Sequence, residues 1–299
     1  MPMTTIDLLM CVSTYRSSKQ AIRMIKSLHH IDGNVLCFIT GALEDEELQA
    51  IRNHVYTNSY ENVIVARSPI NCSVFNQSWA VVWAINNRIT AKYVCFIDDD
   101  VEFTSDSKDM IQAVDDCEPF SICALSNSAA QYETKNGIKK NASWIDECGM
   151  FVRFADCVKY GVRDSQQDAP WIFYTGVEYT HRLRYFTGKP VTINANRIYY
   201  LHHQRTEPEL QEVRSETAHK AFYYAGRFWK DKFGIDMLIN PIGDPRIWSK
   251  LWTLCSSRRH SSHFKKHLIF DGMWTNWKDI YNRYDVEVIY GGEHEQPRL

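Results

Sequence analysis

The sequence lacks an apolar run long enough to cross a membrane. A spanning helix needs about 20 predominantly apolar residues. The apolar run within Met1–Tyr15 is far shorter, and no basic residue precedes it as in a secretory signal. We therefore predict a cytoplasmic protein with no membrane span, whose first apolar run is a buried strand.

An excess of charge of one sign is also missing. The 34 basic and 36 acidic side chains leave a formal net charge of -2, which provides no overall attraction to nucleic acid or to an anionic membrane. The nine cysteines show no C-x-x-C spacing and mostly lie within apolar runs. We therefore predict buried free thiols in a reducing compartment.

Several motifs of common enzyme classes are absent. The chain has no P-loop, G-x-G-x-x-G, H-E-x-x-H or G-x-S-x-G sequence. The sequence therefore gives no motif support for an NTPase, a dinucleotide oxidoreductase, a zincin or an α/β-hydrolase. No internal repeat or low-complexity linker is present either. A chain of 299 residues with 44% hydrophobic residues then predicts one large domain, alone or with a small appendage.

The first 125 residues contain short apolar runs separated by stretches with apolar residues at helical spacing. This alternation predicts an α/β domain with a right-handed, mostly parallel sheet flanked by helices. The expected strands are Ile6–Val12, Asn34–Ile39, Asn62–Ala66, Tyr93–Ile97 and Ser121–Leu125, and the expected helices are Ser18–Leu28, Glu44–Val55 and Asn76–Ile89.

The pattern changes after residue 125. A polar stretch leads into a second apolar block, Trp144–Val158. We then expect a helix over Val177–Phe186, ended by Gly188, and a returning strand over Val191–Leu201. Beyond this strand the pattern predicts helices, including Ser215–Lys232.

The strongest chemical signal is an apolar strand that runs directly into the three carboxylates Asp98, Asp99 and Asp100. Ligands of open parallel sheets bind at the carboxyl ends of the strands, where this triplet falls. Adjacent carboxylates suit a hard cation such as Mg²⁺ or Mn²⁺. A solvated acidic turn before the next helix explains the triplet alone equally well.

In this context the triplet resembles the D-x-D motif of the GT-A glycosyltransferases. The resemblance implies a GT-A type, Rossmann-like sheet and transfer of a hexosyl or related sugar from a nucleotide diphosphate sugar. It also implies that Asp98 faces the nucleoside or ribose and the metal, and that Asp100 ligates Mn²⁺ or Mg²⁺. Asp99 would contribute to either role.

Two further stretches resemble nucleotide-binding segments of the same family. The first strand ends in Thr14, Tyr15 and Arg16, which is similar to the family's T-Y-N-R turn that contacts the nucleobase of the donor. Asn71 and Asn76 occupy a stretch where the family uses loop and helix-start residues near the nucleotide. The second strand ends without the acidic residue that often contacts the nucleobase in this family. The sequence therefore does not indicate which nucleobase the donor carries.

The segment Thr175–Arg184 resembles a family segment in which inverting members carry the catalytic base on an acidic pair. Thr175 and Gly176 stand at the positions of that pair, and Glu178 is the first remaining carboxylate. An inverting enzyme needs a carboxylate on the acceptor side to remove the hydroxyl proton. The resemblance therefore implies that Glu178 is the base, although an ion pair to Arg182 would also explain this glutamate. Asp164 or Asp168 could serve as the base instead, and a retaining mechanism would need no such base.

Two adjacent histidines, His202 and His203, end the strand expected after Gly188. Family members often carry a third metal ligand on a histidine at this place, and imidazole suits Mn²⁺. Side chains alternate along a strand, so only one of the two points inward. We select His202 as the third ligand.

The C-terminal stretch Arg246–Phe270 is a local basic patch. It contains basic residues, histidines and tryptophans and no acidic residue. Such a patch fits a polyanion such as DNA or RNA, a solvated helix face, or a lid over the donor pyrophosphate.

The motifs together predict two parts of the chain. We expect a GT-A catalytic domain over residues 1–204, with a nucleotide-binding half at about 1–103 and an acceptor half at about 104–204. A helical, partly basic extension would cover residues 205–299.

The combined interpretation is a metal-dependent glycosyltransferase that acts on a hydroxyl of a glycan or, as the second choice, of a modified DNA base. Two rival functions stay open. One is a non-catalytic module that binds a sugar nucleotide, and the second is a sugar nucleotidyltransferase that releases pyrophosphate.

Overall fold

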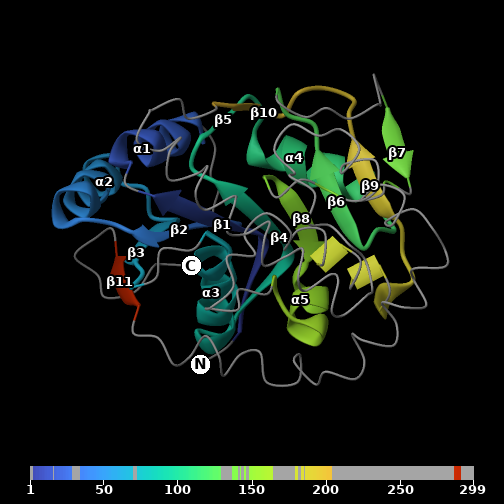
Figure 1. The fold of residues 1–299 in the computed structure, drawn as a ribbon, viewed down its shortest axis with the longest axis horizontal. Coiled ribbons are helices and arrows are strands. Elements are labelled where there is room, and N and C mark those ends of the chain that lie inside the picture. The colour runs from blue at the N-terminus through green and yellow to red at the C-terminus, as the bar shows by residue number, and fades with distance from the viewer. Residues whose placement is uncertain are drawn as a thin grey trace, which may run out of the picture.

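A mixed sheet with helices on both faces forms the centre of the molecule (Figure 1). The computed structural model describes residues 3–15, 17–28, 34–69, 73–128, 137–140, 142, 145, 148–163, 179–180, 183–184, 186–203 and 286–290. Within these residues the sheet has nine strands in the order β11-β3-β2-β1-β4-β8-β6-β9-β7. The α/β fold and the mostly parallel sheet predicted from the sequence are confirmed.

The N-terminal half of the sheet is entirely parallel. It consists of β1 (Thr4–Tyr15), β2 (Val35–Ala42), β3 (Val63–Arg67) and β4 (Ile89–Asp98), with β1 between β2 and β4. Both faces of these strands are covered, which explains why they read as nearly continuous apolar runs. The parallel arrangement brings the carboxyl ends of β1 and β4 together, and Ser13 lies opposite Asp98.

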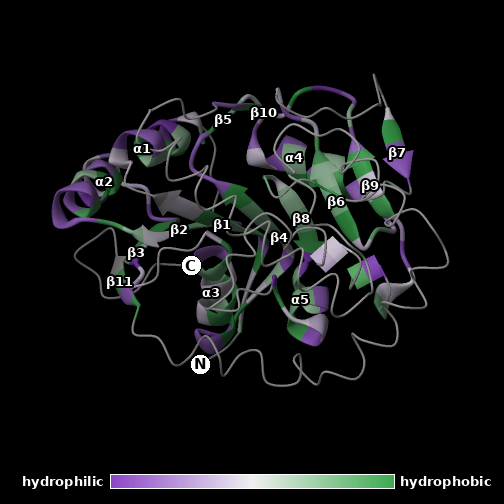
Figure 2. Cartoon of the chain, in the orientation of Figure 1, coloured by the Kyte–Doolittle hydropathy of each residue, from purple (hydrophilic) through white to green (hydrophobic). Residues whose placement is uncertain are grey.

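Helices cover the sheet in two layers, each with its own apolar cluster. One cluster includes residues of α1 (Ser18–Ser27), α2 (Asp45–Thr57) and α4 (Ser107–Asp115). The other includes residues of α3 (Ser73–Asn86) and α5 (Phe154–Tyr160). Figure 2 shows green, hydrophobic strands in the sheet and purple, hydrophilic residues on the outer side of α1 and α2.

Helix α3 begins and ends earlier than the apolar pattern predicts. It starts at Ser73, and the expected last residue, Ile89, belongs instead to β4. Arg88 takes a positive φ of 58°, a left-handed conformation that interrupts the helix before the strand begins. The chain can therefore reverse quickly and bring β4 beside β1.

The second half of the sheet is mixed. Strand β8 runs antiparallel to both β4 and β6, whereas β9 is parallel to β6 and antiparallel to β7. The strands of this half are β6 (Ile122–Leu125), β7 (Ile138–Lys140), β8 (Met150–Arg153) and β9 (Val191–Asn194).

The single strand expected over Val191–Leu201 is wrong, because this stretch forms two strands in different sheets. After β9 the chain turns, and the Asn194 carboxamide oxygen accepts a hydrogen bond from the Asn196 backbone N–H at 3.1 Å. The chain then continues as β10 (Tyr200–His202), which pairs antiparallel with β5 (Val101–Phe103) in a separate sheet. This second sheet joins the segment after β4 to the histidines.

The helix expected before Gly188 agrees with the described residues of that stretch. Residues 179–180, 183–184 and 186–187 are helical. Gly188 follows with a φ of +66°, and its N–H donates to the Arg184 carbonyl at 3.1 Å. The predicted glycine stop is therefore confirmed.

A short strand, β11 (Glu287–Tyr290), pairs antiparallel with the outer edge of β3. No strand was predicted from this part of the sequence. Arg67 on β3 forms ion pairs with Glu287 and with Asp45 on α2, which ties β11 to the N-terminal half of the sheet. The expected helix Ser215–Lys232 lies outside the described residues. No helix in the described part of the chain is long and apolar enough to span a membrane.

Candidate functional site

The acidic triplet lies where the carboxyl ends of β1 and β4 meet. Strand β4 ends at Asp98, and the next two residues connect it to β5. Asp99 and Asp100 are buried, with exposed fractions of 4% and 3%. Burial of carboxylates is costly unless donors or a cation surround them, so the partners of each carboxylate define what this site can do.

Asp98 is held by helix α3. The Gln77 side chain donates from Nε2 to the Asp98 Oδ1 at 3.0 Å and to the Ile97 carbonyl at 2.8 Å. Gln77 is 1% exposed, so its carboxamide has little freedom to turn away. This residue was not predicted from the sequence, although a glutamine within an apolar helix is itself a signal of a buried polar contact.

Asp99 is held by strand β1. The Thr14 hydroxyl donates to the Asp99 Oδ2 at 2.6 Å, and the Asp99 N–H donates to the Ser13 carbonyl at 3.1 Å. Thr14 is 2% exposed. The structure therefore directs the hydroxyl of Thr14, which the resemblance assigned to the nucleotide, to the acidic triplet.

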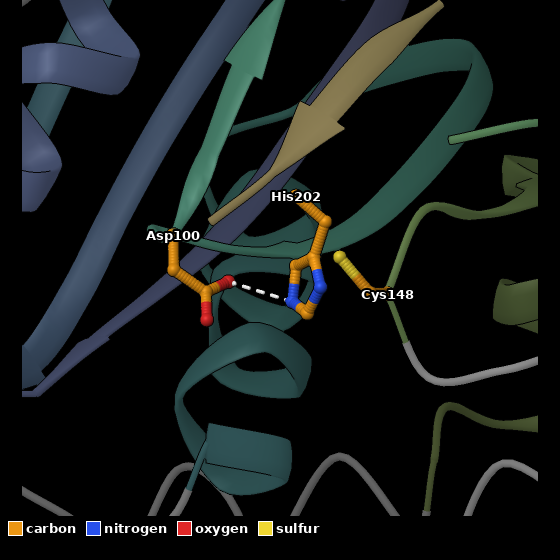
Figure 3. A group of neighbouring side chains, drawn as sticks. All are labelled: Asp100, Cys148 and His202. Carbon is orange, nitrogen blue, oxygen red and sulfur yellow. Dashed lines mark ion pairs between the residues drawn. The ribbon is translucent and has the colours of Figure 1, made fainter. Parts of the chain in front are cut away.

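Asp100 lies in a group with a histidine and a cysteine (Figure 3). The His202 Nε2 on β10 is 3.2 Å from the Asp100 Oδ1. One ligand atom from each of Asp100, His202 and Cys148 lies within 4.8 Å of the other two. Among the described residues this is the one such group of three, and Asp98 does not belong to it.

Cys148 is the member of this group that was not predicted from the sequence. It lies in a turn just before β8, is 8% exposed, and directs its sulfur toward the His202 ring in Figure 3. The sequence offered no C-x-x-C or C-x-x-H spacing near it. Only pairing of β8 with β4 brings it to the end of the acidic strand.

The two adjacent histidines face different partners, as strand alternation requires. His202 faces Asp100, whereas the His203 Nε2 lies 3.0 Å from the Glu102 Oε2. The His203 backbone N–H also donates to the Asp100 carbonyl at 2.7 Å. This backbone bond holds the end of β10 against the acidic triplet.

Tyr200 packs against the turn that carries Cys148. Its hydroxyl donates to the Cys148 carbonyl at 3.0 Å and accepts from the Asn127 Nδ2 at 3.0 Å. Gly149 leaves the space for this ring, because a Cβ at that position would overlap the hydroxyl and lie 2.6 Å from the Tyr200 Cζ. The Gly149 N–H donates to the Phe96 carbonyl on β4 at 2.9 Å. The turn that carries Cys148 is therefore fixed from two sides.

The buried cysteines outside this group are ordinary core thiols. None of the seven described cysteines forms a disulfide and all seven are buried, which confirms the prediction of buried thiols for these seven; Cys72 and Cys255 lie outside the described residues. Burial raises the pKa of the Cys37 thiol to about 12 and also raises the pKa of Cys95. These thiols stay protonated and take part in packing.

Asn76 lies in the first turn of α3, 1% exposed, and its Oδ1 has no hydrogen-bond partner within the described chain. Tyr15 is the last residue of β1, and its side chain is not described. Several predicted site residues lie outside the described residues: Arg16, Asn71, Asp164, Asp168, Thr175, Gly176, Glu178, Arg182 and the basic stretch Arg246–Phe270.

Comparison with known proteins finds similarity in structure alone. No protein-family model and no curated protein matches the sequence. A structure of S. aureus TarS 1–349 superposes with a TM-score of 0.53 at 12% identity, over 93% of this chain and 90% of that chain. The same TarS fragment in complex with UDP-GlcNAc has a TM-score of 0.53 at 11% identity, over 93% and 91% of the two chains.

A second similar structure is the mannosyltransferase PcManGT from Pyrobaculum calidifontis in complex with GDP-Man and Mn²⁺. It has a TM-score of 0.55 at 11% identity and covers 92% of this chain and 83% of that chain. At such low identity these similarities establish the fold.

Proposed function

We propose that this chain, which has the GT-A fold, is a metal-dependent glycosyltransferase that moves a sugar from a nucleotide diphosphate sugar to an acceptor hydroxyl. The observation that supports this best is the convergence of Asp100 and His202, 3.2 Å apart, at the carboxyl ends of the parallel strands. Similar structures hold UDP-GlcNAc or GDP-Man with Mn²⁺, which agrees with a nucleotide sugar as donor.

The described residues fit a divalent ion. A buried carboxylate oxygen and an imidazole nitrogen lie 3.2 Å apart, and such an oxygen and nitrogen donor set suits Mn²⁺ better than Mg²⁺, which prefers oxygen ligands alone. Asp100 and His202 would hold the ion, and Asp98 would face the ion or the ribose. When bound, the ion would stabilise the negative charge that develops on the leaving diphosphate.

The chain's own residues organise the rest of the site. Gln77 orients the Asp98 carboxylate, and Thr14 orients that of Asp99. We assign the base-side contacts of the nucleotide to Tyr15, Arg16, Asn71 and Asn76. These side chains would bind the donor and leave its sugar beside the acceptor.

We assign the role of catalytic base to Glu178. It would remove the proton of the acceptor hydroxyl as the sugar is transferred. Asp164 and Asp168 are the alternative bases, and a retaining mechanism would need none of the three. The preferred acceptor is a glycan hydroxyl. A modified DNA base, bound through the basic stretch Arg246–Phe270 of the extension after residue 204, is the second choice.

Donor binding provides the first test. Calorimetric titration of UDP, GDP, CDP, ADP and dTDP sugars, each with Mn²⁺, Mg²⁺ or EDTA, should reveal one donor that binds only with metal. Asp100→Asn should abolish this binding. Glu102→Gln is the matched control, because it removes a carboxylate two residues away that faces His203 and should leave binding intact.

Catalysis is tested separately. Glu178→Gln should retain donor binding and lose transfer, whereas unchanged transfer would return Glu178 to an ion pair with Arg182. A second outcome is metal-dependent donor binding with neither transfer to any acceptor nor hydrolysis of the donor. This outcome would favour the non-catalytic module. The presence of Thr175 and Gly176 in place of the acidic pair supports that alternative. Release of pyrophosphate from a nucleoside triphosphate and a sugar phosphate would identify a nucleotidyltransferase.

A further inference from the structure

We propose that Cys148 is the third protein ligand of the metal site, beside Asp100 and His202, and that its sulfur makes the site prefer a thiophilic ion such as Zn²⁺ or Co²⁺ over Mg²⁺. The inference rests on the proposed function, because the fourth position of such a site would be left for an oxygen of the donor diphosphate. Three protein ligands and one open position are typical of catalytic zinc sites.

The distances support this ligand set. In a tetrahedral site with metal–ligand bonds of about 2.0–2.3 Å, ligand atoms lie roughly 3.3–3.6 Å apart. The Asp100 and His202 ligand atoms are already 3.2 Å apart. The Cys148 sulfur lies within 4.8 Å of both, so a shift on the order of 1 Å would complete the triangle.

The backbone that carries the sulfur is held in position, because both polar groups of the Cys148–Gly149 peptide unit are hydrogen-bonded. The Tyr200 hydroxyl donates to the Cys148 carbonyl, and the next residue, Gly149, donates its N–H to the Phe96 carbonyl. Tyr200 lies two residues before His202 in β10, so one strand positions two of the three ligands. This preorganisation reduces the cost of bringing the sulfur to the ion.

The surroundings of Cys148 distinguish it from the core cysteines. Cys37 and Cys148 belong to the same apolar cluster, but of the two only Cys148 also has its sulfur within 4.8 Å of a carboxylate oxygen and an imidazole nitrogen (Figure 3). On metal binding the thiol would lose its proton to solvent and the sulfur would bind as thiolate. An oxygen, nitrogen and sulfur donor set favours borderline-soft ions, while Mg²⁺ demands an octahedron of oxygens.

The test is a titration of the full chain with Co²⁺ alone, followed by absorption spectroscopy. A cobalt–thiolate bond adds an intense near-ultraviolet charge-transfer band that oxygen and nitrogen ligands do not produce. The wild-type protein should show this band, and excess Zn²⁺ should remove it whereas excess Mg²⁺ should not. Cys148→Ser should lose the band and weaken Co²⁺ binding by at least about tenfold, since even the partners of metal ligands change affinity by 10–100-fold.

Cys37→Ala is the matched control, because it removes one buried thiol and leaves all three proposed ligands in place. It should retain the band. A wild-type spectrum without the band, or no Co²⁺ binding, would overturn the inference, and so would a band that persists in Cys148→Ser. If Cys148→Ser fails to fold, Cys148→Ala replaces it as the variant that should lose the band, and a wild-type spectrum without the band overturns the inference whatever the variants do.

The two proposals fail in different ways. If nucleotide sugar binding depends on Mn²⁺ but the cobalt complex lacks the thiolate band, the proposed function stands and Cys148 is not a ligand. If the band is present but no nucleotide sugar binds in the presence of any metal, the site holds metal and the proposed function is wrong.

Discussion

Replacement of Gly149 by alanine should destabilise the protein far more than the same change at another glycine with positive φ. Gly149 has a φ of +77°, and its added Cβ would overlap the Tyr200 hydroxyl and lie 2.6 Å from the Cζ of that ring. The left-handed backbone alone costs about 1–2 kcal/mol for a residue with a side chain. Overpacking in a closed site adds about 1–3 kcal/mol.

Gly188→Ala isolates the backbone part of this cost. Gly188 has a similar φ of +66°, and nothing lies within 4 Å of its added Cβ. Denaturant unfolding should therefore show a loss of roughly 1–2 kcal/mol for Gly188→Ala and of roughly 2–5 kcal/mol for Gly149→Ala. The transition midpoint should fall at an unchanged slope in both variants.

The difference between the two variants is the decisive quantity. Equal losses would refute the reasoning, because they would mean that Tyr200 moves aside at little cost and does not hold the turn of Cys148 rigidly. A larger loss in Gly149→Ala, together with weaker Co²⁺ binding, would link the packing behind the site to the position of the sulfur.

A buried hydrogen bond and one histidine provide two further tests. Thr14→Val should lower the free energy of unfolding by about 1–3 kcal/mol, since the buried Asp99 carboxylate loses a donor. Thr40→Val, on the neighbouring strand, is the control, because the buried Thr40 hydroxyl has no hydrogen-bond partner in the described chain. Urea unfolding should show little change in its free energy of unfolding. Equal losses of stability in the two variants would contradict this account. Burial, with a smaller contribution from Lys26, lowers the pKa of His54. The unfolded chain then binds this proton more readily, so stability should fall as the pH drops below about 6.5. His54→Gln should flatten that dependence in unfolding curves measured from pH 7.5 to 5, and an unchanged slope would refute it.

The local pattern of the sequence was sufficient for the N-terminal half of the fold. Parallel strands buried on both faces must be apolar along their length, and helices between them must present an apolar stripe. Both signals are local, so β1, β2, β3 and β4 could be recognised within a few residues of their observed ends. The limits of α3 were less accurate, because a left-handed Arg88 is not visible in an apolar pattern.

Part of the candidate site could also be recognised from local patterns in the sequence. A strand that runs into three aspartates places them at the ligand-binding edge of a parallel sheet wherever the rest of the chain lies. Strand alternation likewise separates His202 from His203. Neither pattern depends on contacts between distant segments.

Tertiary structure alone decided which side chains meet there. Cys148 reaches Asp100 because β8 pairs antiparallel with β4, and His202 reaches it because β10 leaves the large sheet and pairs with β5. Gln77 reaches Asp98 across a helix–sheet interface, and β11 pairs with β3 from the far end of the chain. Contacts between segments distant in sequence follow from strand pairing and packing, and no local period encodes them. The sequence by itself thus determined the α/β class and the acidic edge, whereas the fold determined which side chains gather at that edge.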